Sequence, residues 1–184
     1  KVFRDGDFRA GYYRDQTFMT AIGQYSPKHM FSALYGDPEL EREPSSGSRQ
    51  MMNHFGSRFL NDDGSWKNLM KQKNSTADMA CLASLFPRLV GLAQASQVYR
   101  NRPKLAKEKP KFTNNGSEIA FATIGNASCA EGHFWEAVNA IGVLQVPAII
   151  SIWDDGYGIS VSNDIQMTKN DVSEVLSGFQ RDKK

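Results

Sequence analysis

The sequence predicts an α/β protein built on a parallel sheet flanked by helices, and the last third of the chain supports this most clearly. Residues 118–124 (EIAFATI) are an apolar run typical of a buried strand, and Ala148–Trp153 (AIISIW) are a second. Between them, residues 131–145 predict a helix with one apolar side, formed by Phe134, Trp135, Val138 and Ile141. A strand, a helix and a strand at this spacing indicate a βαβ unit with parallel strands and a right-handed crossover.

The length and composition indicate one domain of an ordinary globular protein. The chain has 184 residues, of which 40% are hydrophobic and 23% are charged. The formal net charge of +2 does not indicate the concentrated basic face that nucleic-acid partners require, and it does not suggest a membrane surface. No apolar run approaches the roughly 20 residues that would span a bilayer. We therefore expect neither nucleic acid nor membrane as a partner.

The cysteines and the two ends of the chain bear on its context. Cys81 and Cys129 are too few for a disulfide framework, which favours a reducing intracellular compartment. The charged start has no signal-peptide pattern. The start at Lys1 and the charge run at 181–184 both look cut, so we expect part of a longer chain.

Upstream of the βαβ unit the pattern predicts helices separated by two long loops. Asp15 is expected to cap a helix that runs to about Gln24, and a second helix is expected to follow Ser26-Pro27 and stop at Gly36. A third is expected from Asp78 to Arg100, with a kink or a restart at Pro87. Residues 37–76 read as a long polar loop that is either functional or disordered, and residues 100–117 as a basic solvated loop.

Both polar turns of the βαβ unit, at 125–128 and 154–158, fall at the carboxyl ends of its strands, where parallel sheets bind ligands. Gly125, Ala127 and Ser128 are small, so a ligand can approach the backbone, and the following helix start favours a phosphate. Asn126 offers an amide oxygen. Asp154 and Asp155 offer carboxylate oxygens, and magnesium prefers such ligands beside phosphate. The residues alone therefore predict a diphosphate and magnesium site, although Asp154-Asp155-Gly156 can also be read as simple turn formers.

Three stretches of the last third then resemble a known fingerprint. They are Gly125-Asn126-Ala127-Ser128-Cys129-Ala130-Glu131-Gly132, Trp135-Glu136-Ala137-Val138-Asn139 and Asp154-Asp155-Gly156-Tyr157-Gly158-Ile159-Ser160, with 26 residues between Ala127 and Asp154. This pattern is similar to that of the thiamine diphosphate-dependent 2-oxo acid dehydrogenases. Upstream, Tyr12-Tyr13-Arg14-Asp15, the segment Gly47–Phe55 and the segment Leu82–Gly91 resemble further family motifs in the right order, so the resemblance covers nearly the whole chain.

The resemblance is to the α subunit, or to the α half of a fused chain, of the branched-chain 2-oxoisovalerate type. It implies the diphosphate-binding half of a thiamine diphosphate-binding fold, incomplete by itself, over residues 1–184. It also implies thiamine diphosphate and Mg²⁺ as cofactors, a β-type half or subunit that is absent here, and a lipoyl acyltransferase as a further partner. The implied reaction decarboxylates a small 2-oxo acid and passes the acyl group to lipoyl, and the chain alone would be inactive.

The resemblance also assigns roles to individual residues. Expected cofactor-binding residues are Tyr13, Arg14, Ala80, Leu82, Gly125, Asn126, Ala127, Ser128 and Asp155. The expected metal ligands are Asn126, Asp155 and the carbonyl of Tyr157, and His54 is the expected catalytic residue, in contact with the substrate or the covalent intermediate. Asn126 and Asp155 exchange the family's usual aspartate and asparagine, which either retains the charge balance around the ion or marks a decayed metal site.

Each assignment has a simpler alternative. Arg14 can form a surface salt bridge with Asp15, while Tyr13 and Leu82 can be core residues and His54 can be structural. Cys129 can have a lowered pKa at a helix start, or be an inert small residue. Leu85 stands where branched-chain members have a glutamine that helps to bind potassium, which puts that ion in doubt.

Function is left with alternatives as well. A pyruvate or acetoin dehydrogenase α subunit, or a non-catalytic cofactor-binding or scaffold domain, remains open beside the branched-chain enzyme. The expected location is the cytoplasm for a bacterial protein, or the mitochondrial matrix for a eukaryotic one.

Overall fold

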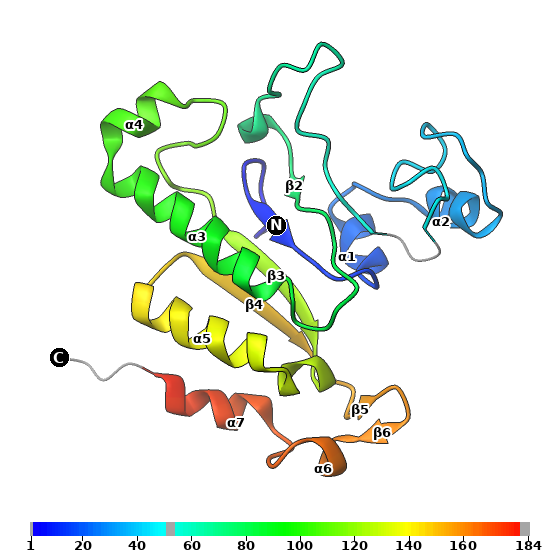
Figure 1. Ribbon diagram of the computed structural model, residues 1–184, viewed down its shortest axis with the longest axis vertical. Helices are drawn as coiled ribbons and strands as arrows, with labels where there is room; N and C mark the ends of the chain where they lie inside the picture. Colours follow the sequence, from blue (N-terminus) through cyan, green and yellow to red (C-terminus); the bar gives the residue numbers. More distant parts are fainter. Residues whose placement is uncertain (1, 51–53, 181–184) are drawn as a thin grey trace.

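The computed structural model describes residues 2–50 and 54–180 and has a four-stranded sheet at its centre (Figure 1). The strand order is β2-β1-β3-β4, and the strands are β1 (Phe8–Ala10), β2 (Asn74–Ser75), β3 (Ala120–Gly125) and β4 (Ala148–Trp153). Every neighbouring pair in this sheet is parallel. The predicted class, a parallel sheet flanked by helices, is confirmed.

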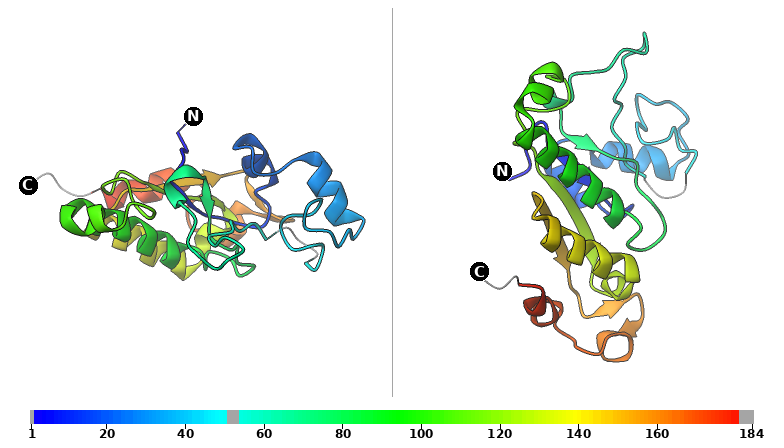
Figure 2. Two further views of the ribbon diagram at one scale, coloured as in Figure 1. Left: turned by 90° about the horizontal axis from the view of Figure 1, so that it is seen from above. Right: turned by 60° about the vertical axis from the view of Figure 1, so that its left-hand side comes forward.

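Alternate residues of β3 face two different layers. Ala120, Ala122 and Ile124 join the main apolar core beneath α3 (Phe86–Asn101) and α5 (Gly132–Leu144), which lie side by side on one face of the sheet (Figures 1 and 2). The Phe86 and Phe134 rings join these two helices edge to face, with centroids 5.4 Å apart. On the opposite face, Phe121 stacks on Phe18 of α1 (Gln16–Ala21) at 4.9 Å. Helix α1 therefore covers this face at Phe121, while Ile149 and Trp153 of β4 stay exposed.

The βαβ unit agrees closely with its prediction. Strand β4 has the predicted bounds, and α5 differs from the predicted helix by one residue at each end. Helix α5 ends because Gln145 adopts a left-handed conformation with φ of 52°, after which the chain turns back into β4. Strand β3 begins two residues later than predicted and includes Gly125.

The predictions for the first half need several corrections. Strands β1 and β2 were not expected, and β2 pairs with β1 from within the stretch read as a long loop. That stretch also contains the 3-10 turn η1 (Leu69–Lys71) and the buried Glu43, whose carboxylate accepts from the main-chain N–H groups of Ser45, Ser46 and Ser48. The part of it that the structure describes thus combines such polar contacts with scattered buried apolar residues, Phe55 and Leu69, which follow no regular period.

Two helices of this region differ from their predictions: α1 ends at Ala21 rather than near Gln24, and α3 starts later than Asp78. Helix α3 starts at Phe86 because Pro87 occupies its first turn, and the preceding residues form a turn with Ala83 at φ of 56°. Helix α2 (Pro27–Leu34) is capped by Ser26 and is followed by Gly36 at φ of 72°, as predicted. The predicted cap at Asp15 is wrong, because its side chain makes no cap bond to α1. A short helix, α4 (Pro103–Glu108), interrupts the predicted basic loop.

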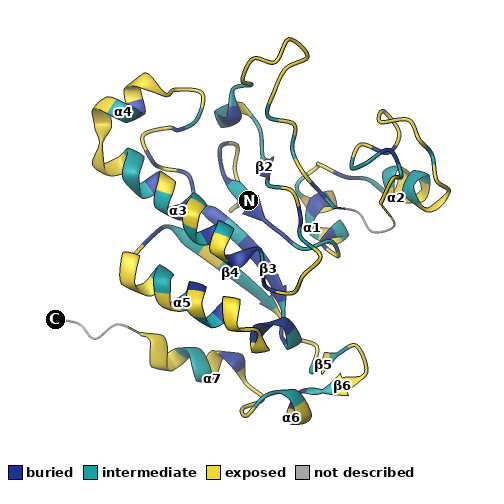
Figure 3. Ribbon diagram, in the orientation of Figure 1, coloured by how far each residue is buried: buried dark blue, intermediate teal, exposed yellow. Residues whose placement is uncertain are grey.

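After β4 the chain forms a small region beside the carboxyl end of the sheet (Figure 1). Its elements are the antiparallel strands β5 (Tyr157–Gly158) and β6 (Val161–Ser162), then α6 (Asn163–Gln166), α7 (Val172–Leu176) and η3 (Ser177–Phe179). Most residues of β1, β2 and β3 are buried, while the outward faces of the helices are exposed (Figure 3). Within residues 2–50 and 54–180, no helix combines the length and apolar character needed to cross a bilayer.

Candidate functional site

A cleft of about 540 Å³ opens at the carboxyl ends of the strands. Four stretches of chain contribute to its lining: the turn after β1, the segment with Leu82, the end of β3 with the turn that follows it, and the chain from the end of β4 onwards. Its lining includes Tyr13, Arg14, Leu82, Gly125, Asn126, Ala127, Ser128, Asp155 and Tyr157. Nine of the eleven predicted site residues are therefore brought to one cavity, as expected for ligands at this edge of a parallel sheet.

The turn after β3 presents backbone and small side chains to this cleft. Strand β3 ends at Gly125, and the chain passes through the 3-10 turn η2 (Ala127–Ala130) before α5 starts. A Cβ added at Gly125 would meet no protein atom closer than the Trp153 carbonyl oxygen, at 4.0 Å. Packing within the protein therefore does not require glycine here, whereas a ligand that lies close to the backbone would.

Asn126 is held in a fixed orientation at the base of the cleft. Its side chain is buried, and its amide nitrogen donates to Oδ1 of Asn163 at 2.7 Å. Asn163 in turn donates from Nδ2 to Oδ1 of Asp154 at 3.4 Å. Because the Asn126 nitrogen is used as a donor, its oxygen is the atom suited to a cation. Asn163 was missed in the sequence, since nothing in the pattern indicated that it lies beside Asn126.

The two aspartates after β4 have different environments. Asp155 lines the cleft together with Asn126, and its Oδ1 accepts from the Tyr157 N–H at 3.1 Å. Asp154 does not line the cleft and accepts from the Gly156 N–H at 2.9 Å. The expectation that both aspartates face the crevice is therefore corrected for Asp154, which acts as a turn former and a partner of Asn163.

The donor set at the cleft suits magnesium that is shared with a phosphate. It comprises one carboxylate at Asp155, one amide oxygen at Asn126 and the nearby main chain of Tyr157, all hard oxygen ligands. Within the described part of the chain, no three His, Cys, Asp or Glu side chains are grouped so as to hold a metal ion. An ion bound here would have to complete its shell with ligand oxygens and water.

On the other side of the cleft, Arg14 lies over two tyrosine rings. Its Cζ is 5.4 Å from the Tyr12 ring centroid and 5.5 Å from that of Tyr13, and Nη2 donates to the Tyr12 hydroxyl at 3.2 Å. The Tyr12 hydroxyl donates to that of Tyr13 at 2.9 Å, and this hydrogen bond lowers the pKa of Tyr13. The alternative of a surface salt bridge between Arg14 and Asp15 is wrong, since Asp15 is buried and pairs with Arg9. The exposed guanidinium suits a diphosphate oxygen.

The remaining predicted residues divide into two groups. Leu82 lines the cleft and is 41% exposed, so it is not an ordinary core leucine. Tyr13 also lines the cleft, and its ring stacks on that of His54 at 5.8 Å. His54 and Ala80 do not themselves line the cleft. Their roles stay predictions, as do those of residues 51–53, which lie outside the described residues.

Two departures from the family pattern have a structural explanation. Leu85 is 2% exposed and packs in the main apolar core, so its side chain is a core contact and supplies no potassium ligand. Burial raises the pKa of Cys129 to about 12, with the carboxylate of Asp154 contributing. The idea of a lowered pKa at this helix start is wrong, and Cys129 is an inert core residue.

Comparison with known proteins agrees with this geometry. Residues 1–180 match the family model described as Dehydrogenase E1 component. The 2-oxoisovalerate dehydrogenase subunit alpha of Bacillus subtilis (strain 168) is 28% identical over 176 residues. That alignment covers 96% of this chain and 44% of the Bacillus protein, so the chain spans less than half the length of this relative.

Proposed function

Because the chain belongs to the dehydrogenase E1 component family, we propose that its cleft binds the diphosphate of thiamine diphosphate through Mg²⁺. Membership of the family implies thiamine diphosphate as the cofactor. The observation that carries the proposal is that Asn126 and Asp155, which follow different strands, line one cleft together with Arg14. This supports the proposal, because the Asn126 and Asp155 oxygens suit Mg²⁺ and the Arg14 guanidinium suits phosphate oxygens.

In this proposal each side of the cleft has a distinct task. Asn126, Asp155 and the Tyr157 carbonyl hold the ion, while Arg14 donates to phosphate oxygens. Leu82 and Tyr13 supply apolar contacts beside the rest of the cofactor, and Tyr13 brings the His54 ring towards the site. When bound, thiamine diphosphate supplies the electron sink for decarboxylation, and this chain's residues bind and orient it.

The proposed substrate is a branched-chain 2-oxo acid. The relative from Bacillus subtilis is named a 2-oxoisovalerate dehydrogenase subunit alpha. Within the segment Gly47–Phe55, Arg49-Gln50-Met51 with His54 resembles the motif of the branched-chain members, which favours the same substrate. We further propose a β-type half or subunit as partner, transfer of the acyl group to a lipoyl acyltransferase, and inactivity of this chain alone. The proposed location is the bacterial cytoplasm, or the mitochondrial matrix in a eukaryote.

A panel of 2-oxo acids tests this proposal on the complete enzyme with its partner half, thiamine diphosphate and Mg²⁺. We expect release of carbon dioxide that depends on lipoyl acceptor, with 2-oxoisovalerate preferred over pyruvate in kcat/KM. Preference for pyruvate would instead support a pyruvate dehydrogenase α subunit, and acylation of the lipoyl acceptor from acetoin, which releases no carbon dioxide, would support an acetoin dehydrogenase. Cofactor binding without turnover of any 2-oxo acid would support a scaffold domain and contradict the proposed reaction.

A further inference from the structure

Arg9 lies in the middle of β1 and has no exposed surface. It is in register with Ser75 of β2 and Phe121 of β3, so its side chain lies on the face of the sheet that carries Phe121, opposite the core face of Ala10. A guanidinium stays charged in a protein, and a buried charge is tolerated only when it is paired and hydrogen-bonded. The burial of Arg9 is therefore possible only because of its partners, and their positions show which segments it connects.

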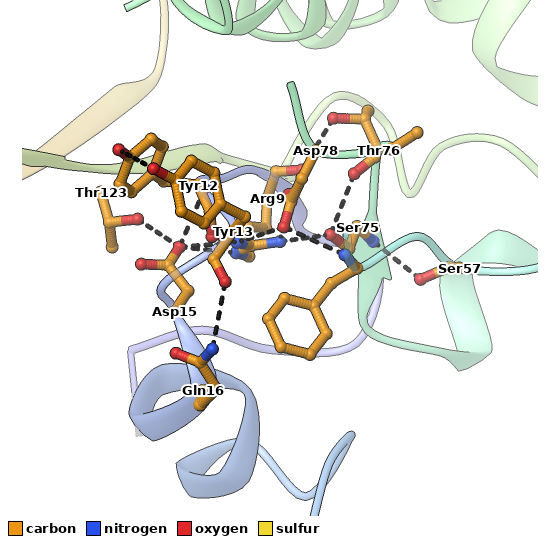
Figure 4. Close-up of polar contacts among 12 residues, drawn as sticks. Arg9, Tyr12, Tyr13, Asp15, Gln16, Ser57, Ser75, Thr76, Asp78 and Thr123 are labelled. Atoms are coloured by element: carbon orange, nitrogen blue, oxygen red, sulfur yellow. Dashed lines mark hydrogen bonds and ion pairs between the residues drawn. The ribbon is translucent and has the colours of Figure 1, made fainter. Parts of the chain in front are cut away.

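All three guanidinium nitrogens of Arg9 donate hydrogen bonds (Figure 4). Asp15 accepts from Nε at 3.0 Å and from Nη2 at 2.6 Å. Asp78 accepts from Nη1 at 2.8 Å and from Nη2 at 3.2 Å. Nη1 also donates to Oγ of Ser75 at 2.7 Å, and Nη2 donates to the carbonyl oxygen of Tyr12 at 2.9 Å. One cation thus bridges two carboxylates from different segments.

Two partners of Arg9, Tyr12 and Asp15, belong to a stretch of chain that reaches the candidate site. Tyr12 and Asp15 flank Tyr13 and Arg14 on the turn after β1. Asp15 also accepts from the hydroxyl of Thr123, which lies two residues before the cleft-lining Gly125. Arg9 therefore fixes the tyrosine–arginine turn relative to the end of β3.

Asp78, a further partner of Arg9, and Phe55, which contacts both, connect the guanidinium to two more stretches of the chain. Asp78 lies four residues before Leu82, and its Oδ2 accepts from the Phe55 N–H at 3.0 Å. The Phe55 ring centroid is 5.5 Å from Cζ of Arg9, and Phe55 directly follows His54. Through Asp78 and Phe55, the same guanidinium contacts the segments that carry Leu82 and His54.

We infer that Arg9 is a positioning residue, which holds the tyrosine–arginine turn, the His54 segment and the Leu82 segment in the arrangement that the cleft needs. Arg9 does not line the cleft, so it acts only through these segments. The part of the inference that concerns cofactor affinity rests on the proposed function; the part that concerns the three segments does not.

Holding these three segments requires an arginine at position 9 and free space beside its guanidinium group. The planar fork of arginine reaches two carboxylates at once, whereas lysine offers one compact ammonium group. The space is provided by Gly11, since a Cβ built there would lie 1.7 Å from Cζ of Arg9 and 1.9 Å from its Nη2. An alanine at this position must displace a guanidinium that several hydrogen bonds hold in place.

Two variants separate geometry from charge, and a third variant is the control. Arg9→Lys keeps the charge but loses the fork, and Gly11→Ala keeps Arg9 but displaces it. Arg100→Lys is the matched control. Arg100 donates from Nε and Nη2 to the Gly116 carbonyl oxygen at 3.1 and 2.7 Å, near the amino end of β3 and far from the cleft. Hydrogen–deuterium exchange and calorimetric titration with thiamine diphosphate and Mg²⁺ are measured on the complete enzyme at a temperature where all variants are folded.

We expect faster exchange in residues 11–16, 54–57 and 76–83 for both Arg9→Lys and Gly11→Ala, with other segments unchanged. Cofactor affinity should fall by roughly tenfold to hundredfold, as is usual when residues that orient a ligand-binding group are lost. Arg100→Lys should alter neither quantity. If a variant melts earlier yet keeps wild-type exchange in these three segments and wild-type affinity, the inference is overturned and Arg9 is only structural.

Asp78→Asn gives a milder and more selective test, which decides the matter if the other variants do not fold. It leaves the Arg9–Asp15 pair in place, so exchange should rise in 54–57 and 76–83 but not in 11–16. Equal effects in all three segments, or in none, would contradict the arrangement. Failure of the proposed function is distinguishable, because the wild-type enzyme would then bind no thiamine diphosphate although the exchange pattern still reports on Arg9.

Discussion

The two halves of the candidate site are built by different kinds of interaction. The βαβ half, from β3 to β4, is held by an apolar core in which Phe86, Phe134 and the alternate residues of β3 pack together. The other half, from β1 to Leu82, is held at the site by a buried ion cluster around Arg9. The stability of apolar packing depends on the buried area and on how closely the side chains fit, whereas that of the ion cluster depends on charge and on hydrogen-bond geometry. The two halves should therefore respond differently to substitution and to pH.

The largest expected effect is on the apolar half. Phe134→Ala removes a ring with no exposed surface and should lower the free energy of unfolding by about 3–5 kcal/mol. Phe179→Ala is the control, because Phe179 is 40% exposed and its ring only stacks on Trp135 at 5.9 Å. Urea unfolding measures both variants. Equal losses for the two would contradict the view that the packing between α3 and α5 dominates this half.

The second expected effect is a pH dependence confined to the ionic half. Burial raises the pKa of Asp78 above its ordinary value, although the Arg9 charge and the Phe55 N–H oppose the rise. The folded state then holds this proton more tightly than the unfolded state. Stability from this group is present below the unfolded pKa near 3.8 and is lost as pH rises through the folded pKa. Each tenfold difference in proton affinity corresponds to about 1.4 kcal/mol.

Comparing wild type with Asp78→Asn at pH 4, 5.5 and 7 isolates this contribution. The variant has no carboxyl to titrate at this position, so the stability of wild type relative to the variant should decline as pH rises. Denaturant unfolding at the three pH values gives the comparison. A relative stability that increases with pH would show that Arg9 lowers the Asp78 pKa overall, contrary to the account.

The smallest expected effect concerns the two cysteines. Cys81 is exposed, while Cys129 is buried in the main apolar core and has a pKa raised to about 12. A thiol reagent at pH 8 should modify Cys81 in the folded protein and reach Cys129 only after unfolding, because the thiolate is the reacting form. Peptide mapping after labelling distinguishes them. Modification of Cys129 at the rate of Cys81 would mean that the core beside η2 opens readily.

The same contrast explains what the sequence could predict. Strand β4, helix α5 and the turns at Gly125–Ser128 and Asp155 were predicted correctly, because apolar periodicity and turn residues are local signals. Strands β1 and β2 were missed because they have three and two residues and hold buried polar side chains such as Arg9 and Asn74. In a single sequence, a buried arginine looks the same as an exposed one.

The candidate site was predicted in the same uneven way. The family motifs identified residues that meet in one cleft, including Arg14 and Asp155 from distant parts of the chain. The sequence does not reveal Asn163, because its partner Asn126 is 37 residues away. It does not reveal Arg9 either, because that side chain binds several partners at once, among them Ser75 and Asp78, 66 and 69 residues away. The sequence predicts Asp15 as a helix cap because an aspartate just before a helix often has that role. In the structure its carboxylate instead accepts hydrogen bonds from Arg9 and Thr123.

We propose that one divalent ion joins Asn126 and Asp155 to a diphosphate. Calorimetric titration of thiamine diphosphate, with and without Mg²⁺, on the complete enzyme carrying Asp155→Ala tests it most directly. Asp63→Ala is the matched control, because the carboxylate of Asp63 is also exposed and accepts from a main-chain N–H two residues on. We predict that Asp155→Ala abolishes magnesium-dependent binding while Asp63→Ala leaves it unchanged. Wild-type affinity in Asp155→Ala would contradict the account.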